Sequence, residues 1–204
     1  MKSFIVVAID GVAGSGKSTT ARNIANRLHF LHVDTGSHYR AITVALMKSN
    51  VSPEQVSSTE NLNKFDLSSN ILANKSEILI NDTSFTPDIL RSEKVNSVVS
   101  SYASNPLVRD LLFKYQRSQI ELALSQNFNG LVMEGRDIGS IIFPDANLKI
   151  YLTADDKIRN QRRVSDGEND KILLRDKIDS TRKVAPLVQS KDSIIIDTGE
   201  FSVD

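Results

Sequence analysis

Eight residues near the start of the chain have the types and spacing that bind phosphate. Residues 11–18 read Gly-Val-Ala-Gly-Ser-Gly-Lys-Ser, the pattern G-x-x-x-x-G-K-S. Glycines let backbone N–H groups point inward at phosphate oxygens, and the start of a following helix adds partial positive charge. The Lys17 ammonium would reach the β- and γ-phosphates, and the Ser18 hydroxyl would hold Mg²⁺ directly or through water. This segment, called the phosphate loop below, predicts binding of a nucleoside triphosphate.

Two further loops carry arginines next to carboxylates. Residues 34–40 read Asp-Thr-Gly-Ser-His-Tyr-Arg, and residues 134–137 read Glu-Gly-Arg-Asp. Each loop follows an apolar run, so both are expected at the carboxyl edge of a parallel sheet, beside the phosphate loop. A kinase for a small anionic acceptor needs arginines that converge from separate loops, because a second anion must lie beside the γ-phosphate. Taken singly, each arginine also fits a solvated surface residue; two such loops at one edge favour a substrate site.

The elements that must position these loops alternate between strands and helices. Short apolar runs bounded by turn residues predict five buried strands, at 4–9, 30–33, 131–133, 148–152 and 194–196. Helical spacing of apolar residues predicts helices at 17–28, 37–48 and 107–125, the last begun by Pro106. This alternation predicts an α/β fold with a five-stranded parallel sheet and helices on both faces.

One stretch interrupts the alternation. Residues 50–105 begin with a region rich in Ser, Asn, Asp and Thr, and we interpret the whole stretch as a subdomain inserted into a single domain of residues 1–204. Within it, 77–80 and 83–85 flank Asn81-Asp82 and predict a β-hairpin, and 88–103 predicts a helix. A second irregular stretch covers 164–170.

Composition excludes several classes of protein. The 204 residues include 25 Lys and Arg against 25 Asp and Glu, so the basic excess typical of proteins that bind long nucleic acid or anionic membranes is missing. There are no cysteines, which excludes disulfides and thiol chemistry. The three histidines (His29, His32 and His38) are too few and too close in sequence for a histidine metal site. The apolar run at 4–9 is too short for a membrane span or a signal peptide, so a cytoplasmic location is expected.

A GTPase is the first alternative. Residues 63–66 read Asn-Lys-Phe-Asp and match the guanine-reading pattern N-K-x-D. However, no Asp in the chain has Gly three residues later, so the D-x-x-G element of those proteins is absent. The tetrapeptide also follows no predicted strand, and a polar helix end explains it better.

The motifs together resemble those of the bacterial cytidylate kinases, members of the nucleoside monophosphate kinase family of P-loop proteins. The matching segments run in order along nearly the whole chain, at 9–19, 34–40, 108–109, 134–139, 143–146 and 175–187. The last segment, Arg-Asp…Asp-Ser…Arg…Ala-Pro-Leu, is more specific to this family than the phosphate loop, which many families share. The enlarged nucleotide-binding subdomain of the bacterial enzymes is similar to the insertion at 50–105.

The resemblance implies residues for each substrate. ATP would be bound by Gly11, Val12, Ala13, Gly14, Ser15, Gly16, Lys17, Ser18 and Thr19. For CMP, it implies that Ser100, Arg109 and Asp137 read the cytosine, whose N4 amino group needs an acceptor and whose ring acceptors need a donor. The acceptor phosphate would be held by Arg40, Arg136 and Arg182, with Arg175 and Asp179 around the ribose. Thr35 and Tyr39 would line the acceptor site, although Tyr39 is equally well explained as a packed core aromatic.

In this family, residues 159–182 correspond to a lid whose arginines close over the transferring phosphoryl group. The residues that the resemblance assigns to catalysis are Lys17, Arg136, Arg162, Arg163 and Arg182. The sequence departs from the family in three places: in the lid, in the loop at 34–40, and at 201–204, where the relatives continue into a final helix. Only 11 residues separate Arg163 from Arg175, fewer than is usual for the lid, and Ser37-His38 replaces a small residue followed by an apolar one.

The expected reaction is phosphoryl transfer from ATP to CMP or dCMP with Mg²⁺, by a monomer that binds neither nucleic acid nor membrane. Two alternatives remain open at this point. One is a kinase for another monophosphate, such as UMP or AMP. The other is a non-catalytic ATP-binding regulatory module, which would need the phosphate loop without converging acceptor arginines.

Overall fold

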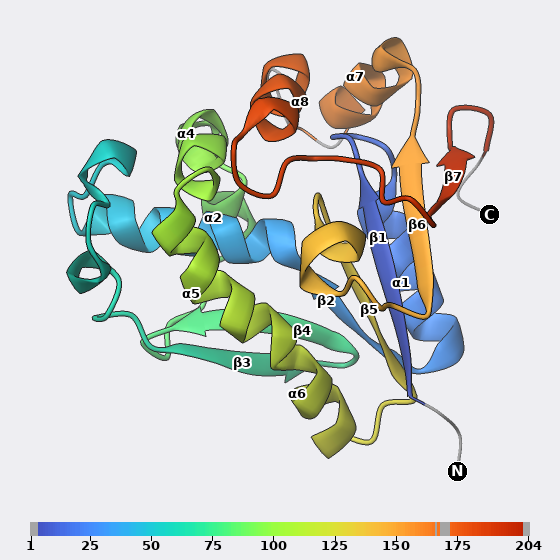
Figure 1. Ribbon diagram of the computed structural model, residues 1–204, viewed down its shortest axis with the longest axis horizontal. Helices are drawn as coiled ribbons and strands as arrows, with labels where there is room; N and C mark the ends of the chain where they lie inside the picture. Colours follow the sequence, from blue (N-terminus) through green and yellow to red (C-terminus); the bar gives the residue numbers. More distant parts are fainter. Residues whose placement is uncertain (1–3, 166, 168–171, 202–204) are drawn as a thin grey trace.

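The computed structural model describes residues 4–165, 167 and 172–201, and a seven-stranded sheet in the order β3-β4-β2-β5-β1-β6-β7 runs through it (Figure 1). The strands are β1 (Ile5–Gly11), β2 (Phe30–Asp34), β3 (Leu67–Leu72), β4 (Lys75–Ile80), β5 (Gly130–Gly135), β6 (Leu148–Thr153) and β7 (Ile194–Asp197). Every neighbouring pair is parallel except β3 with β4, which is antiparallel. The α/β class and the positions of all five predicted strands are therefore confirmed, but β7 is a largely exposed edge strand and not a buried one.

The expectation of a five-stranded, wholly parallel sheet was wrong, because residues 50–105 add two strands to it. The hairpin within this stretch also lies earlier than predicted: β3 and β4 are joined at Ala73-Asn74, and the hairpin predicted across Asn81-Asp82 is reduced to one isolated bridge between Ile80 and Thr83. β4 continues the main sheet by pairing with β2 in parallel, with Lys75 opposite His32. The polar sequence of β3, Leu-Ser-Ser-Asn-Ile-Leu, gives no run of apolar residues, so an apolar-run criterion misses it.

The helices follow the predicted order, but the helices predicted at 88–103 and at 107–125 are each divided into two. They are α1 (Lys17–Leu28), α2 (Thr35–Lys48), α3 (Pro87–Leu90), α4 (Glu93–Ala103), α5 (Pro106–Arg117), α6 (Gln119–Ser125), α7 (Asp156–Ser165) and α8 (Ile172–Thr181), with a π-helix, η3, at Ile138–Ile142. The single helix predicted at 107–125 is two helices, because Ser118 ends α5 and precedes α6. The Asn105 side chain caps α5 by accepting a hydrogen bond from the Leu107 N–H at 2.9 Å.

Helices cover both faces of the sheet, as predicted. Alternate strand residues point to opposite faces, so Val7 and Ile9 pack on α1 whereas Val6 and Ala8 pack towards α6 and η3. A third apolar cluster joins α2 and α5 to β4. Among the described residues, none of the helices combines the length and the apolar character that a membrane crossing requires.

The arrangement gathers functional loops at one edge of the sheet. β1 leads into the phosphate loop, β2 into α2, and β5 into η3, so three loops meet at the carboxyl ends of adjacent parallel strands. Helices α7 and α8 lie over this edge, and α8 also contacts α4 (Figure 1). The irregular stretch expected at 164–170 falls largely outside the described residues.

Candidate active site

The phosphate loop has the backbone conformation that its glycines allow. Gly11 ends β1 with φ 147°, and a Cβ there would lie 2.1 Å from the carbonyl oxygen of Leu152 on β6. Gly16 precedes α1 with φ 83°, in the left-handed region that suits glycine. The loop therefore wraps closely against the sheet and delivers its chain directly into the N-terminus of α1, the end that attracts anions.

Lys17 lies inside this loop with its charge incompletely balanced. Its Nζ donates a hydrogen bond to the Val12 carbonyl oxygen at 2.7 Å. Burial, helped by the positive charge of Arg136, lowers the pKa of Lys17 to about 7, although Glu134 opposes the shift. The site is thus short of negative charge, which is the electrostatic condition that favours binding of a polyphosphate.

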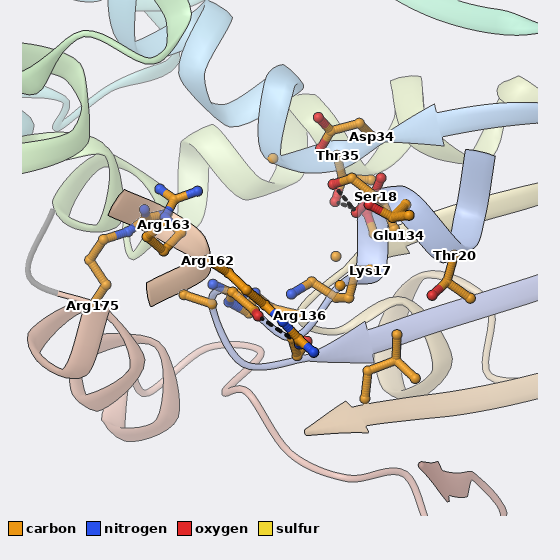
Figure 2. A pocket seen from close by; sticks show the side chains of 18 of the residues that line it. Lys17, Ser18, Thr20, Asp34, Thr35, Glu134, Arg136, Arg162, Arg163 and Arg175 are labelled. Carbon is orange, nitrogen blue, oxygen red and sulfur yellow. Dashed lines mark hydrogen bonds between the residues drawn. The ribbon is translucent and has the colours of Figure 1, made fainter. Parts of the chain in front are cut away.

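Ser18 and Glu134 meet at the mouth of the loop (Figure 2). The Ser18 hydroxyl donates a hydrogen bond to Glu134 Oε2 at 2.8 Å, and His32 Nε2 lies 2.9 Å from Glu134 Oε1. Glu134 is the penultimate residue of β5, and its backbone carbonyl accepts a hydrogen bond from the Thr35 hydroxyl at 2.7 Å. Three adjacent elements therefore fix the position of this buried carboxylate.

This oxygen-rich arrangement fits Mg²⁺. Mg²⁺ prefers oxygen ligands and usually keeps several waters, binding through one or two protein groups plus substrate phosphates. Ser18 Oγ and the Glu134 carboxylate are such groups, and Lys17 marks where phosphates would lie. Among the described residues, no group of three or more His, Cys, Asp or Glu side chains is placed to hold a metal by itself, so the phosphates would complete the coordination.

The loop after β5 is held in place by Asp10. Its carboxylate accepts hydrogen bonds from the backbone N–H groups of Ile138 at 2.8 Å and Gly139 at 2.7 Å, at the start of η3. Burial raises the pKa of Asp10 to about 6 against the effect of these hydrogen bonds. Asp10 therefore orders the segment that contains Arg136 and Asp137.

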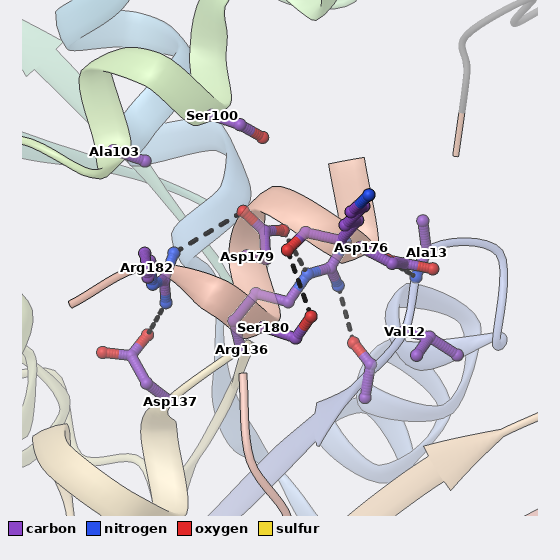
Figure 3. A network of polar contacts seen from close by, with 12 residues as sticks. Val12, Ala13, Ser100, Ala103, Arg136, Asp137, Asp176, Asp179, Ser180 and Arg182 are labelled. Atoms are coloured by element: carbon purple, nitrogen blue, oxygen red, sulfur yellow. Dashed lines mark hydrogen bonds and ion pairs between the residues drawn. The ribbon is translucent and has the colours of Figure 1, made fainter. Parts of the chain in front are cut away.

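A network of arginines and carboxylates extends from this segment to α8 (Figure 3). Arg136 donates from Nε to Asp179 Oδ2 at 3.0 Å and from Nη1 to the Gly11 carbonyl oxygen at 2.6 Å. Arg182 lies 3.5 Å from Asp137 Oδ1 and 3.6 Å from Asp179 Oδ1. Burial and the nearby Arg109 charge lower the pKa of Arg182. Cationic groups are thus packed closely enough to repel one another, and an added anion would relieve that repulsion.

Asp137 also forms an ion pair with Arg109, a buried residue of α5. Arg109 Nη2 donates a hydrogen bond to Asp137 Oδ2, and Nη1 donates to the Ala103 carbonyl oxygen at 3.1 Å. The Arg109 guanidinium lies 5.3 Å from the centre of the Tyr39 ring, and burial raises the pKa of the Tyr39 hydroxyl to about 12. Tyr39 is therefore largely buried and also lines the cavity described next.

One cavity of about 1010 Å³ joins the phosphate loop to this network. Of the residues predicted for substrate binding or catalysis, it is lined by Ala13, Gly14, Ser15, Gly16, Lys17, Ser18, Thr19, Thr35, Tyr39, Arg40, Ser100, Arg136, Asp137, Arg162, Arg163, Arg175, Asp179 and Arg182. Gly11, Val12 and Arg109 do not line it. Nine of the lining residues are Lys or Arg and four are Asp or Glu, so the cavity favours anionic ligands.

The arginines expected in the lid have different surroundings. Arg162 donates from Nη1 to the Thr198 hydroxyl at 2.9 Å and from Nη2 to its carbonyl oxygen at 2.7 Å. Arg163 and Arg175 point towards the cavity from α7 and α8 (Figure 2). Arg159 does not line it, because this residue pairs with Asp156 and Asp176 and donates to the Ala13 carbonyl oxygen at 2.8 Å.

Sequence reasoning assigned no role to three residues of this region. Glu134 could have been noticed as an acid at the carboxyl end of a strand beside the phosphate loop. Asp176 accepts a hydrogen bond from the Ala13 N–H at 3.0 Å, and Thr198 donates to the Ser15 carbonyl oxygen at 3.1 Å. These last two contacts span 163 and 183 residues of sequence, and no local pattern indicates them.

Comparisons with known proteins show which family the chain belongs to. The model of the family "Cytidylate kinase" matches residues 7–204. The chain is 39% identical over 212 residues to the cytidylate kinase of Clostridium botulinum (strain Loch Maree / Type A3), covering 98% of this chain and 93% of that one. It is 36% identical over 215 residues to the cytidylate kinase of Chloroherpeton thalassium (strain ATCC 35110 / GB-78), covering 98% and 88%. The chain therefore belongs to the cytidylate kinase family.

Proposed function

We propose that the protein transfers the γ-phosphoryl group of ATP to CMP or dCMP, releasing ADP and CDP or dCDP. The observation that carries this proposal is a cavity lined both by the phosphate loop and by Asp137 and Arg182, with Arg136 between them in contact with Gly11. A donor phosphate at the loop and an acceptor phosphate near Arg182 would lie on either side of Arg136. Membership of the family supports a cytosine nucleotide as the acceptor.

In this proposal, the phosphate loop from Gly11 to Thr19 binds ATP, and Lys17 neutralises charge on the transferring group. The acceptor phosphate is held by Arg40, Arg136 and Arg182, and the ribose lies near Arg175 and Asp179. Arg162 and Arg163 add positive charge from α7. No general base is required, because the acceptor is already an anion at neutral pH. Alignment and positive charge around the phosphoryl group then supply the rate enhancement.

The base would be read by Ser100 and Asp137, both of which line the cavity. Arg109 lies behind Asp137, so we assign it mainly to holding that carboxylate in position rather than to direct contact with the base. The Asp137 carboxylate can accept a hydrogen bond from the cytosine N4 amino group, a donor that uracil lacks at the same position. Thr35 and Tyr39 complete the acceptor wall.

Mg²⁺, bound at Ser18 and Glu134 with the ATP phosphates, would neutralise charge on the β- and γ-phosphates. We further propose that residues 50–105 act as the acceptor-binding subdomain, which is supported by the position of Ser100 in the cavity wall, and that 159–182 act as the lid. We also propose that the enzyme acts as a monomer. A cytoplasmic location would match the supply of ATP and nucleoside monophosphates.

An ADP-release assay with each monophosphate in turn tests the proposal. We expect turnover with CMP and dCMP to exceed that with UMP and AMP. Greater turnover with UMP or AMP would contradict the cytosine assignment. Tight ATP binding without transfer to any monophosphate would instead indicate the non-catalytic module.

A further inference from the structure

The buried His32 lies at the inner end of a line of three polar side chains. It belongs to β2, and its Nε2 is 2.9 Å from Glu134 Oε1 on the neighbouring strand β5. The opposite oxygen of the same carboxylate, Oε2, accepts a hydrogen bond from the Ser18 hydroxyl at 2.8 Å. The His32 and Glu134 side chains are 7% and 3% exposed, so solvent does not replace this contact easily.

The direction of each hydrogen bond in this line follows from the chemistry of its members. An ionised carboxylate only accepts hydrogen bonds, so His32 must carry a hydrogen on Nε2, and the Ser18 hydroxyl hydrogen must point at Glu134. With that hydrogen directed at Glu134, the lone pairs of Ser18 Oγ face away from the carboxylate, where Mg²⁺ and phosphate oxygens would lie. The orientation of the Ser18 hydroxyl thus depends on where Glu134 Oε2 is held.

We infer that His32 is a positioning residue, which holds the Glu134 carboxylate in the orientation that aligns Ser18 for the metal–nucleotide complex. Glu134 has several rotatable bonds, and without His32 its Oε1 would be a buried acceptor without this donor. The carboxylate would then turn towards another donor and leave Ser18. Outer hydrogen bonds of this kind typically contribute about 10- to 100-fold to metal affinity. This role rests on the proposed function only in requiring a metal–nucleotide complex, and it is independent of which monophosphate is the acceptor.

The test measures binding of Mn²⁺, as a spectroscopic substitute for Mg²⁺, to the protein saturated with ADP. His32→Leu removes the donor and keeps an apolar side chain of similar size, and we expect it to weaken Mn²⁺ binding about 10-fold or more. His32→Gln keeps an N–H donor near the position of Nε2, and we expect it to recover most of the affinity. An unchanged Mn²⁺ affinity in folded His32→Leu, or no recovery in His32→Gln, would overturn the inference.

His38→Leu is a matched control, because it makes the same chemical change at a second buried histidine. Within the described part of the chain, neither ring nitrogen of His38 has a hydrogen-bond partner. We expect this variant to bind Mn²⁺ as the wild type does. An equal loss in His38→Leu and His32→Leu would show that the effect does not depend on the contact with Glu134 and would overturn the inference.

A double variant shows whether His32 acts through Ser18. If it does, His32→Leu should have little further effect on Mn²⁺ affinity in a Ser18→Ala background, because the group that it aligns is already missing. Fully additive losses would contradict action through Ser18. A spectrum of the wild-type protein gives a test that does not depend on variants folding: ¹⁵N-labelled histidine should show His32 with its hydrogen on Nε2, and a hydrogen on Nδ1 alone would overturn the inference.

These measurements separate the two proposals. Mn²⁺ binding to the ADP complex involves no acceptor, so failure to phosphorylate CMP would refute the proposed function without changing these readouts. Conversely, if the protein phosphorylates CMP but its Mn²⁺ affinity is unchanged by substitution of His32, only the inference is refuted.

Discussion

Arg136 donates a hydrogen bond from Nε to Asp179 Oδ2 at 3.0 Å, joining the loop after β5 to helix α8 across 43 residues of sequence. Asp179 also lies 3.6 Å from Arg182, so one carboxylate holds two of the cations proposed to bind the acceptor phosphate. Burial alone would raise the pKa of Asp179, but the charges of Arg136 and Arg182 outweigh it and lower the pKa. The acceptor end is therefore organised by internal ion pairs, before any substrate binds.

Arg136→Lys tests the geometry of this pairing. A lysine keeps the charge but cannot donate to Asp179 and to the Gly11 carbonyl oxygen together. We expect kcat with CMP to fall about 100-fold or more, because a cation aimed at the transferring group is displaced, while the KM for ATP changes little. Arg27→Lys, on the exposed side of α1, is the matched control. Wild-type kcat in Arg136→Lys would remove this residue from the proposed catalytic set.

Asp137→Asn tests base reading. The amide keeps the shape of the side chain but presents both a donor and an acceptor, so its contacts with Arg109, Arg182 and the cytosine amino group cannot all be kept. We expect the KM for CMP to rise about 10- to 100-fold, with the KM for ATP nearly unchanged. Asp110→Asn makes the same change on the exposed face of α5. If the KM and kcat for CMP are unaltered in Asp137→Asn, the cytosine site lies elsewhere.

The low pKa of Lys17 predicts that the protein takes up protons when ATP binds. Its pKa of about 7 in the free protein means that most molecules carry a neutral Lys17 at pH 8. Bound phosphates favour the ammonium form and raise this pKa, so binding at pH 8 should take up a large part of one proton at this residue. Calorimetry in buffers of different ionisation enthalpy measures the uptake, with Lys17→Met as the reference that subtracts protons from ATP itself. Equal uptake in wild type and Lys17→Met would contradict the depressed pKa.

The low pKa of the buried His38 predicts that the protein loses stability as the pH falls. Burial lowers the pKa of its imidazole to about 4, against 6.5 for the ordinary group. Between these values the unfolded chain binds a proton that the folded chain does not, so stability falls as the pH decreases from 6.5 to 4, by an amount on the order of 3 kcal/mol.

His38→Leu should remove this pH dependence and, by removing unpaired buried nitrogens, stabilise the protein by about 1 kcal/mol at pH 7. Urea unfolding at pH 7.0 and 5.0 measures both effects. A variant that is less stable than wild type at both pH values would show that the imidazole contributes favourable contacts, with its edge-to-face packing on Tyr115 as the first candidate.

The fold was predictable where burial leaves a simple pattern. The strands β1, β2, β5 and β6 are short apolar runs because helices cover them, whereas β7 is an apolar run at the exposed edge of the sheet. The phosphate loop is specified by its glycines, Lys17 and Ser18. The pair β3–β4 was missed because β3 carries Ser68, Ser69 and Asn70 in place of an apolar run. The break at Ser118 was missed because apolar residues continue at helical spacing on both sides of it.

The candidate site likewise contains residues that could be predicted from the sequence and residues that could not. Residues in contiguous motifs, such as Lys17, Arg136 and Asp137, could be named from sequence. The roles of His32 and Asp176 depend on contacts across strands and helices, which only the three-dimensional arrangement reveals. Arg109 shows the intermediate case, since a helix was predicted at its position, although without the break at Ser118, but its burial behind Asp137 was not predicted.

Competition between acceptors tests the central claim most directly. ATP labelled with ³²P in the γ-phosphate is supplied in limiting amount with equimolar CMP, UMP and AMP, and the labelled diphosphates are separated. Asp137 at the acceptor end of the cavity predicts that most of the label appears first in CDP. A majority of the label in UDP or ADP, at early times and low conversion, would contradict the account.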